Sequence, residues 1–317
     1  MRRYHVILNT SAGTALAQGI TSETLEEAFA AQGLDATIDW RCEDTLTDRI
    51  ARAKKSGADV IVAAGGDGTA TAIAEAVVGT SQALAVLPLG TANLLARDLG
   101  LPLDVKQAVA DLGTMVEKKI DVAEVNGRVF LHKTVIGVVP EIAAAREQIR
   151  GRKDVGARLG FISYFFRRLS RARRIAVEIT PRAGTPRIER VQAIAVANND
   201  YDAGFGRIFT RERLDGGSLS LYLIRHLTVA DVFRLVTEMI LGTWREDAAI
   251  EIENVGAVTL RMKKRAVKAM IDGEVETLQL PLSFKIRPGA LTVLVPAPAP
   301  APATKEPEDQ PEYAVGI

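Results

Sequence analysis

Apolar runs alternate with helical patterns along the first 120 residues of the chain. Four runs rich in apolar residues predict strands, and the segments that follow them show the spacing of amphipathic helices. The strands are expected at 4–9, 35–40, 59–66 and 83–90, and the helices at 21–33, 45–57, 69–78 and 91–100. Repeated strand–helix units predict a doubly wound α/β domain with a parallel sheet.

After Ile120 the pattern changes to short strand-like runs. The Asn126-Gly127 pair between two such runs is a strong hairpin signal. Only residues 141–172 and 228–244 show helical spacing in this half, which is therefore predicted to form an antiparallel β sandwich or barrel. The chain is expected to divide into an α/β domain at 1–119, a β-rich domain at 120–295, and a Pro-rich, disordered tail at 296–317.

Composition excludes several classes of function. The 317 residues include 40 basic and 39 acidic side chains, so a net charge of +1 provides no overall field that would attract nucleic acid. The single cysteine, Cys42, cannot form an internal disulfide, and the three histidines lack the spacing of a zinc site. No apolar run approaches the roughly 18 residues of a membrane span, and the N-terminus lacks a signal-peptide pattern. We expect a cytoplasmic protein that is soluble or at most lies on a membrane surface.

Glycine-rich polar segments follow three of the predicted strands. The third strand runs into Gly65-Gly66-Asp67-Gly68-Thr69, the fourth into Gly90-Thr91, and the first into Asn9, Ser11 and Gly13. Doubly wound sheets bind ligands at the carboxyl ends of their strands, where glycines let the backbone approach a phosphate and helix N-termini favour anions. A carboxylate such as Asp67 beside phosphates is typical of a Mg²⁺ site, because Mg²⁺ binds carboxylate and phosphate oxygens together.

The Gly65–Thr69 segment by itself has an alternative interpretation as a tight turn in which Thr69 caps the next helix. Neither the Walker motif nor the spaced Gly-x-Gly-x-x-Gly motif is present. Three polar segments at one edge of the sheet nevertheless favour a nucleotide-binding cleft over a simple turn.

Three motifs, in order along the chain, carry a resemblance to a known family. "GGDGT" follows an apolar strand, "LPLGTANLLAR" follows the next strand, and "IDGE" lies near the C-terminus. Over residues 4–295 the chain resembles the diacylglycerol and sphingosine lipid kinases. The resemblance implies Mg-ATP-dependent phosphorylation of a lipid hydroxyl. It also implies an N-terminal nucleotide-binding domain, a C-terminal β-rich domain, and an active site in the cleft between them.

The resemblance also implies roles for individual residues. Asp67, Asp121 and Glu274 are the implied catalytic residues, with Glu274 as the general base and Asp121 joining Asp67 in a metal–water network. ATP would bind at Asn9, Gly65, Gly66, Asp67, Gly68, Thr69, Gly90 and Thr91. Phosphoryl transfer needs mainly positioning, charge neutralisation and a base for the proton of the nucleophile. Taken alone, Asp272-Gly273 has an alternative interpretation as a type I′ turn that leaves Glu274 in solvent.

Several positions depart from the family's pattern. Leu94 stands where an aspartate of the metal network is frequent, and Ala72 stands where a glutamate is usual. Asp215 matches a ligand of a structural Mg²⁺ in some members, but Ser220 replaces a second carboxylate. The catalytic metal is therefore expected to depend mainly on Asp67.

Residues 150–174 combine arginines with aromatic side chains at helical spacing. This pattern is typical of an interfacial helix, whose rings enter the acyl boundary while its cations bind anionic head groups. The side chains expected to contact the membrane are Phe161, Phe165, Phe166, Arg167 and Arg168. The alternative is an ordinary amphipathic helix that packs on the β-rich domain and leaves its basic face in solvent.

Two other functions stay open at this point. NAD kinases share a Gly-Gly-Asp-Gly loop and a similar two-domain plan, although this chain lacks the Asn-x-Gly-x-Leu-Gly-Phe-like segment that they usually carry. A lipid- or nucleotide-binding relative without catalysis would account for Leu94 and Ala72, but it would not need Asp67 and Glu274. The sequence does not name the lipid, and a homodimer paired through a sheet edge also stays open.

Overall fold

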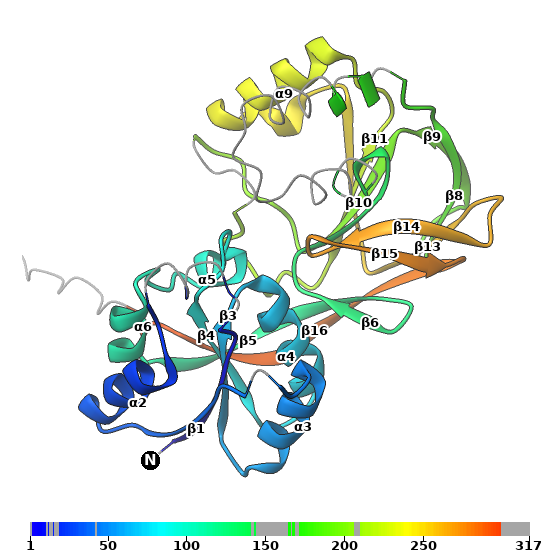
Figure 1. Ribbon diagram of the computed structural model, residues 1–317. Helices are drawn as coiled ribbons and strands as arrows, with labels where there is room; N and C mark the ends of the chain where they lie inside the picture. The colour runs from blue at the N-terminus through cyan, green and yellow to red at the C-terminus, as the bar shows by residue number, and fades with distance from the viewer. Residues whose placement is uncertain are drawn as a thin grey trace, which may run out of the picture.

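The computed structural model, shown in Figure 1, describes residues 2–10, 12, 15, 19–41, 43–140, 143, 164–165, 167–168, 171–205 and 210–298. Parallel strands and helices make up the N-terminal part of the described chain. Antiparallel strands and one longer helix, α9 (Val229–Leu241), make up the C-terminal part. Both predicted architectures, the α/β domain and the β-rich sandwich, are confirmed.

Four parallel strands begin a ten-stranded sheet, in the spatial order β2-β1-β3-β4. They are β1 (Arg3–Leu8), β2 (Asp35–Asp39), β3 (Val60–Gly65) and β4 (Ala83–Pro88). Every residue of β3 and β4 is buried, as expected where helices cover both faces of a parallel sheet. In Figure 1, α3 (Leu46–Lys55) and α4 (Asp67–Val77) lie on one face, and α2 (Ser22–Ala31) and α6 (Val105–Asp111) lie on the other.

Side chains just before the helices determine where they begin. Thr21, Thr45 and Asp104 each accept a hydrogen bond from a backbone N–H in the first turn of α2, α3 and α6. The helix α4 begins at Asp67 rather than at the predicted Thr69, with the extended Gly66 as its N-cap. The short helix α5 (Leu94–Asp98) follows β4, and α6 was not predicted from the sequence.

The antiparallel strands form two packed layers around a second core. One layer has the order β12-β11-β10-β7-β14-β15. Its strands are β7 (Lys133–Gly137), β10 (Ala193–Asn198), β11 (Leu219–Ile224), β12 (Ile250–Val255), β14 (Ala266–Ile271) and β15 (Glu274–Gln279). The other layer contains β6 (Arg128–Phe130), β8 (Ile175–Pro181), β9 (Arg187–Val191) and β13 (Ala257–Arg261). Between the layers the rings of Phe130 and Phe284 meet edge to face, with centroids 6.2 Å apart.

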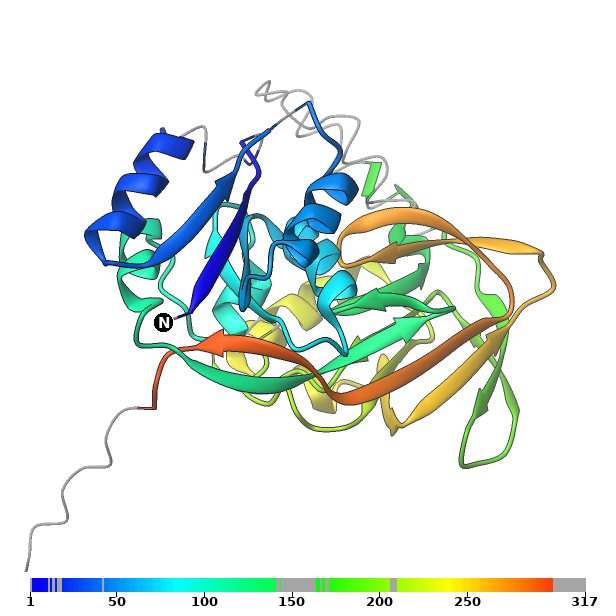
Figure 2. The same ribbon diagram turned by 90° about the horizontal axis from the view of Figure 1, so that it is seen from below.

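Two long strands connect the halves, as Figure 2 shows. β5 (Val116–Val125) and β16 (Leu282–Val295) pair along most of their length. β16 pairs with β13 near its start and with β4 near its end, so one hydrogen-bonded sheet continues from the α/β part into the β-rich part. The predicted boundary at residue 120 falls inside β5. Among the described helices, none has the length and apolar content needed to cross a bilayer.

Candidate active site

The polar segments after β1, β3 and β4 lie together at one edge of the parallel sheet. The backbone N–H of Asn9 donates to the carbonyl of Ala64 at 2.8 Å, and its side-chain Nδ2 lies 3.2 Å from Thr69 Oγ1. Thr91 is exposed in the loop between β4 and α5. Ser11 and Gly13 lie outside the described residues. The structure thus brings together Asn9, the Gly65–Thr69 segment and the Gly90 loop.

Gly66 and Gly90 form the closest approach between two of these segments. A Cβ atom added to Gly90 would lie 2.5 Å from the Cα of Gly66 and 2.8 Å from Asn93 Oδ1. Asn93 adopts a left-handed conformation, and its side chain closes the loop by bonding both the N–H and the carbonyl of Gly90 at 2.8 Å. Only glycine allows the two backbones to lie this close together.

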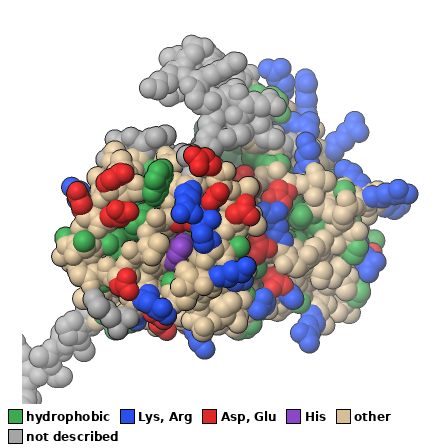
Figure 3. All heavy atoms as spheres, turned by 60° about the horizontal axis from the view of Figure 1, so that its bottom comes forward, with side chains coloured by type: hydrophobic (Ala, Val, Ile, Leu, Met, Phe, Trp, Pro, Cys, Tyr) green, Lys and Arg blue, Asp and Glu red, His purple; other side chains and the backbone are tan. Residues whose placement is uncertain are grey.

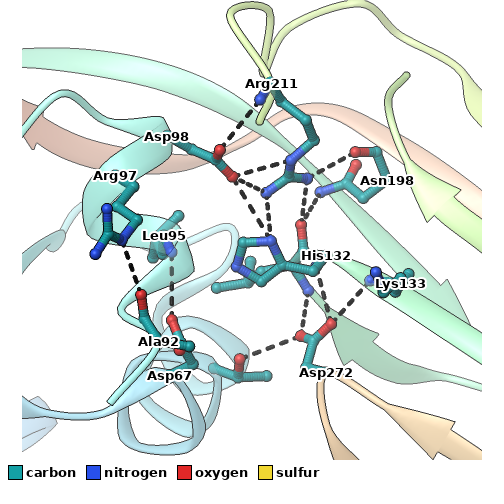
Figure 4. A network of polar contacts seen from close by, with 12 residues as sticks. Asp67, Ala92, Leu95, Arg97, Asp98, His132, Lys133, Asn198, Arg211 and Asp272 are labelled. Atoms are coloured by element: carbon teal, nitrogen blue, oxygen red, sulfur yellow. Dashed lines mark hydrogen bonds and ion pairs between the residues drawn. The ribbon is translucent and has the colours of Figure 1, made fainter. Parts of the chain in front are cut away.

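Asp67 lies in the first turn of α4 and faces the start of α5. Its Oδ1 accepts the backbone N–H of Leu95 at 3.3 Å, as Figure 4 shows. Burial raises the pKa of the Asp67 carboxyl, although amides at the start of α5 oppose the rise. A partly desolvated carboxylate at a helix N-terminus is suited to a divalent cation, which would offset the cost of burying its charge.

Glu274 reaches the same place from the β-rich part of the molecule. It follows the tight turn between β14 and β15, in which Asp272 and Gly273 both have positive φ angles of 46° and 99°. Its Oε1 lies 4.0 Å from the position that a Cβ atom on Gly68 would occupy. Glu274 is exposed, as the turn interpretation expected, and its carboxylate faces the first turn of α4.

Asp272 holds this turn against the α/β part, a role that sequence reasoning missed. Its carboxylate accepts the backbone N–H groups of Leu131, His132 and Lys133 at 2.7, 2.9 and 3.0 Å. Thr71, on α4, donates to Asp272 Oδ2 at 3.2 Å. Burial raises the pKa of the Asp272 carboxyl, and the amide donors oppose the rise. The "IDGE" motif contains this residue, but no local signal distinguishes it from a turn aspartate.

A buried ion pair lies beside the turn and also joins the two parts of the chain (Figure 4). Arg211 is fully buried and bonds Asp98, at the end of α5, with Nε at 3.0 Å and Nη2 at 2.6 Å. Its Nη1 donates to the carbonyls of Leu131 and Asn198 at 2.7 Å each. His132 accepts the guanidinium at Nδ1, and burial lowers the pKa of this imidazole well below its ordinary range. The pair depends on residues 113 positions apart, so the sequence offered no signal for it.

Asp121 lies in β5 with both carboxylate oxygens bonded to backbone amides. Oδ2 accepts from Gly217 at 2.6 Å and Oδ1 from Gly289 at 2.8 Å. Within the described part of the chain, no hydrogen bond joins Asp121 to Asp67. Its contacts tie β5 to two loops, and the expected place in a metal–water network stays a prediction.

Asp215 and Ser220 differ in exposure and in their partners, and metal binding at Asp215 stays a prediction. Asp215 is 52% exposed with Arg213 at 3.9 Å, whereas Ser220 is fully buried and donates to Asn254 Oδ1 at 2.8 Å. Over the ranges that the structure describes, no group of three His, Cys, Asp or Glu side chains could hold a metal ion. Of the expected membrane contacts, Phe161 and Phe166 lie outside the described residues.

Comparisons with known proteins agree with the division into an α/β part and a β-rich part. Residues 3–125 match the model of the diacylglycerol kinase catalytic domain, and residues 143–295 match the YegS C-terminal NAD kinase β-sandwich-like domain. The chain belongs to the diacylglycerol kinase-like family. The family places it among the phosphotransferases that bind nucleotides.

Solved structures share the fold over nearly the whole chain. A diacylglycerol kinase from Bacillus anthracis is 21% identical, with a TM-score of 0.64 over 94% of this chain and 98% of its own. A further structure from the same organism is 22% identical, with a TM-score of 0.71 over 94% and 98%. At 21–22% identity these similarities show a shared fold of both domains.

Proposed function

We propose that this chain transfers the γ-phosphoryl group of Mg-ATP to the hydroxyl group of a lipid. The observation that carries the proposal is the position of Glu274, whose carboxylate faces Gly68 in the first turn of α4. A helix N-terminus suited to phosphate and a carboxylate suited to act as a base thereby lie close together, although they are far apart in the sequence. Phosphoryl transfer needs these two components together.

In the proposed reaction Glu274 accepts the proton of the lipid hydroxyl as its oxygen bonds to the γ-phosphorus. The bond from that phosphorus to the bridging oxygen of ADP breaks at the same time. The Gly68 N–H, at the start of α4, has no partner in the described structure and is available to a phosphate oxygen. Asn9 and Thr69 border the same helix end.

Asp67 is the residue proposed to hold Mg²⁺, through water or directly. The fit rests on its oxygen ligands and on burial, which makes an uncompensated charge costly there. When bound, Mg²⁺ would neutralise charge on the phosphates. The neighbouring Leu94 contributes no carboxylate, so the protein part of the site depends on few side chains.

The lipid acceptor leads us to propose a cytoplasmic protein that associates with anionic membrane surfaces. The sequence of residues 150–174 supports this, because it combines aromatic rings with arginines. Phe165, Arg167 and Arg168 belong to this segment and are described by the structure, each with further contacts of its own. Diacylglycerol-like lipids are the acceptor class that the family suggests.

Transfer of labelled phosphate from ATP to a panel of lipids, with NAD as a separate acceptor, tests the proposal. Glu274→Gln should lower the rate by about 10²–10⁴-fold, the usual contribution of a general base. Glu276→Gln is the matched control: it lies on the same strand but bonds Arg128, so its rate should stay near wild type. Asp67→Ala should also abolish transfer.

Three results would contradict the proposal. Labelling of NAD alone would indicate an NAD kinase, and labelling of no acceptor would indicate a binding protein. A Glu274→Gln rate equal to that of Glu276→Gln would remove Glu274 from the role of base.

A further inference from the structure

A basic pocket lies in the β-rich part, at the end of β14 remote from Glu274. The pocket has a volume of about 480 Å³ and is lined by the segment before β8, the end of β7, and the turn between β13 and β14. Four of its lining side chains are the cations Arg171, Arg173, Lys264 and Lys268. The first half of β14, from Ala266 to Lys268, lines the pocket, and the strand ends just before the Asp272 turn. Three residues, about 10 Å of strand, therefore lie between Lys268 and that turn.

Among the described residues, no acidic side chain neutralises these four cations. All four side chains are exposed, and none of them forms an ion pair with another described residue. The described residues that line the pocket include no Asp or Glu. Other arginines of the same domain are paired, for example Arg187 with Glu253 and Arg234 with Asp247. Four cations around one hollow, without an acidic partner in the described part of the chain, produce a positive potential that attracts an anion.

An apolar hollow of about 410 Å³ adjoins the pocket. The two share Ile175, Met262 and Lys264, and the hollow continues toward Ile188, whose side chain is 71% exposed. Its accessible lining is mostly apolar, and Glu178 is the acidic residue on it. In Figure 3, Lys and Arg side chains project from the end of the molecule that carries β8, β9 and β13.

We propose that this pocket binds the phosphate head group of an anionic lipid in a bilayer, with the adjoining hollow against its acyl or glycerol portion. A basic pocket beside an apolar surface suits an amphiphile, whereas a soluble phosphate would leave the exposed Ile188 and the half-buried Met262 without a contact. Arg168, from the segment proposed to lie at the membrane, also lines the pocket. The proposal builds on the proposed action at a bilayer and adds a binding site separate from the phosphoryl-transfer site.

Flotation with vesicles tests the site without nucleotide. Each Lys or Arg near an anionic surface contributes about fivefold to binding, so Lys264→Ala/Lys268→Ala should weaken binding by about 25-fold. The vesicles are phosphatidylcholine with about 30 mol% phosphatidic acid, and pure phosphatidylcholine should not bind. Lys54→Ala/Lys55→Ala, on exposed α3 residues of the other domain, removes the same charge and should leave binding near wild type.

Three further measurements test which anion binds and whether the variants fold. Lys264→Arg/Lys268→Arg should bind as wild type does, because it keeps both charges. Inorganic phosphate should not displace the protein from vesicles at concentrations that match the ionic strength of the control salt. Transfer of phosphate to a detergent-solubilised lipid should be unchanged in Lys264→Ala/Lys268→Ala, which separates failure of this site from failure of the kinase reaction.

The proposal is overturned if the two alanine pairs weaken binding equally, because the effect would then be one of net charge. It is also overturned if Lys264→Ala/Lys268→Ala binds like wild type, or if inorganic phosphate competes and identifies a site for a soluble anion.

Discussion

Replacing Gly90 with alanine tests the close approach of the β3 and β4 ends. The new Cβ atom would lie 2.5 Å from Gly66 Cα and 2.8 Å from Asn93 Oδ1. Carbon atoms prefer separations of about 3.5–4.0 Å, so one backbone would have to move by about 1 Å. Gly68→Ala is the matched control, because its Cβ would meet only the flexible tip of Glu274, at 4.0 Å.

The cost of Gly90→Ala follows from these contacts. Overpacking against a neighbour costs about 1–3 kcal/mol, and the upper end applies because the neighbour is backbone. Displacing Asn93 from the Gly90 N–H removes a hydrogen bond worth about 1 kcal/mol. Alanine recovers about 0.4–1 kcal/mol by restricting the unfolded chain, which leaves a loss of about 3 kcal/mol. Gly68→Ala keeps only the gain and should be neutral or stabilising.

Urea unfolding followed by far-ultraviolet circular dichroism measures both variants. Gly90→Ala should lower the free energy of unfolding by about 3 kcal/mol without changing the slope of that free energy against urea concentration. Gly68→Ala should leave the free energy of unfolding unchanged or raise it slightly. The same loss should appear as a melting temperature lower by about 6–12 °C. Equal stabilities for the two variants would refute the reasoning, because the strand ends could not then be in contact.

Two further predictions concern buried charge. Asp67→Asn should raise the melting temperature at pH 7–8, because burial raises the pKa of the Asp67 carboxyl and makes its ionised form costly in the folded state. Because the pKa is raised, the cost of ionising Asp67 in the folded state grows as the pH rises from the ordinary pKa of Asp to the pKa of the folded protein. The advantage of Asn should therefore shrink in acid and disappear below the ordinary pKa of Asp. A pH series of melting curves checks this, and a destabilised variant at neutral pH would contradict it. Arg211→Met should cost about 3–5 kcal/mol, because it leaves Asp98 buried without its partner. Combining it with Asp98→Leu should cost clearly less than the two single changes together, and purely additive losses in urea unfolding would show that the pair is not coupled.

The α/β part shows which secondary-structure elements the local sequence pattern predicts correctly. The four predicted strands and the helices α2 and α3 form within a residue or two of their expected bounds, because apolar runs and capping side chains act locally. The start of α4 was misplaced because an extended glycine can cap a helix without any side-chain signal. The seven-residue α6 was missed because so short an amphipathic pattern is weak.

The Asp272-Gly273 turn shows where local pattern stops. Its type I′ geometry was one of the two sequence interpretations, and the positive φ angles agree with it. Its packing against α4 could not be predicted from the sequence, because Asp272 forms hydrogen bonds with Thr71 and with the Leu131–Lys133 backbone, all more than 130 residues away. The local sequence around Asp272 is the same whether this residue only forms a turn or also positions the turn by contacts with distant residues.

The sequence by itself determined the elements and the chemistry that they carry: parallel strands that end in glycine loops, Asp67 at one of them, and a carboxylate at Glu274. These follow from backbone preference and hydrophobic spacing, which act over a few residues. The tertiary structure alone decided which of these groups meet. It brought Gly66 against Gly90, placed Glu274 before α4, and bound Asp121 to the Gly217 and Gly289 amides. Such contacts depend on how β5 and β16 join the two parts, and no short segment encodes that geometry.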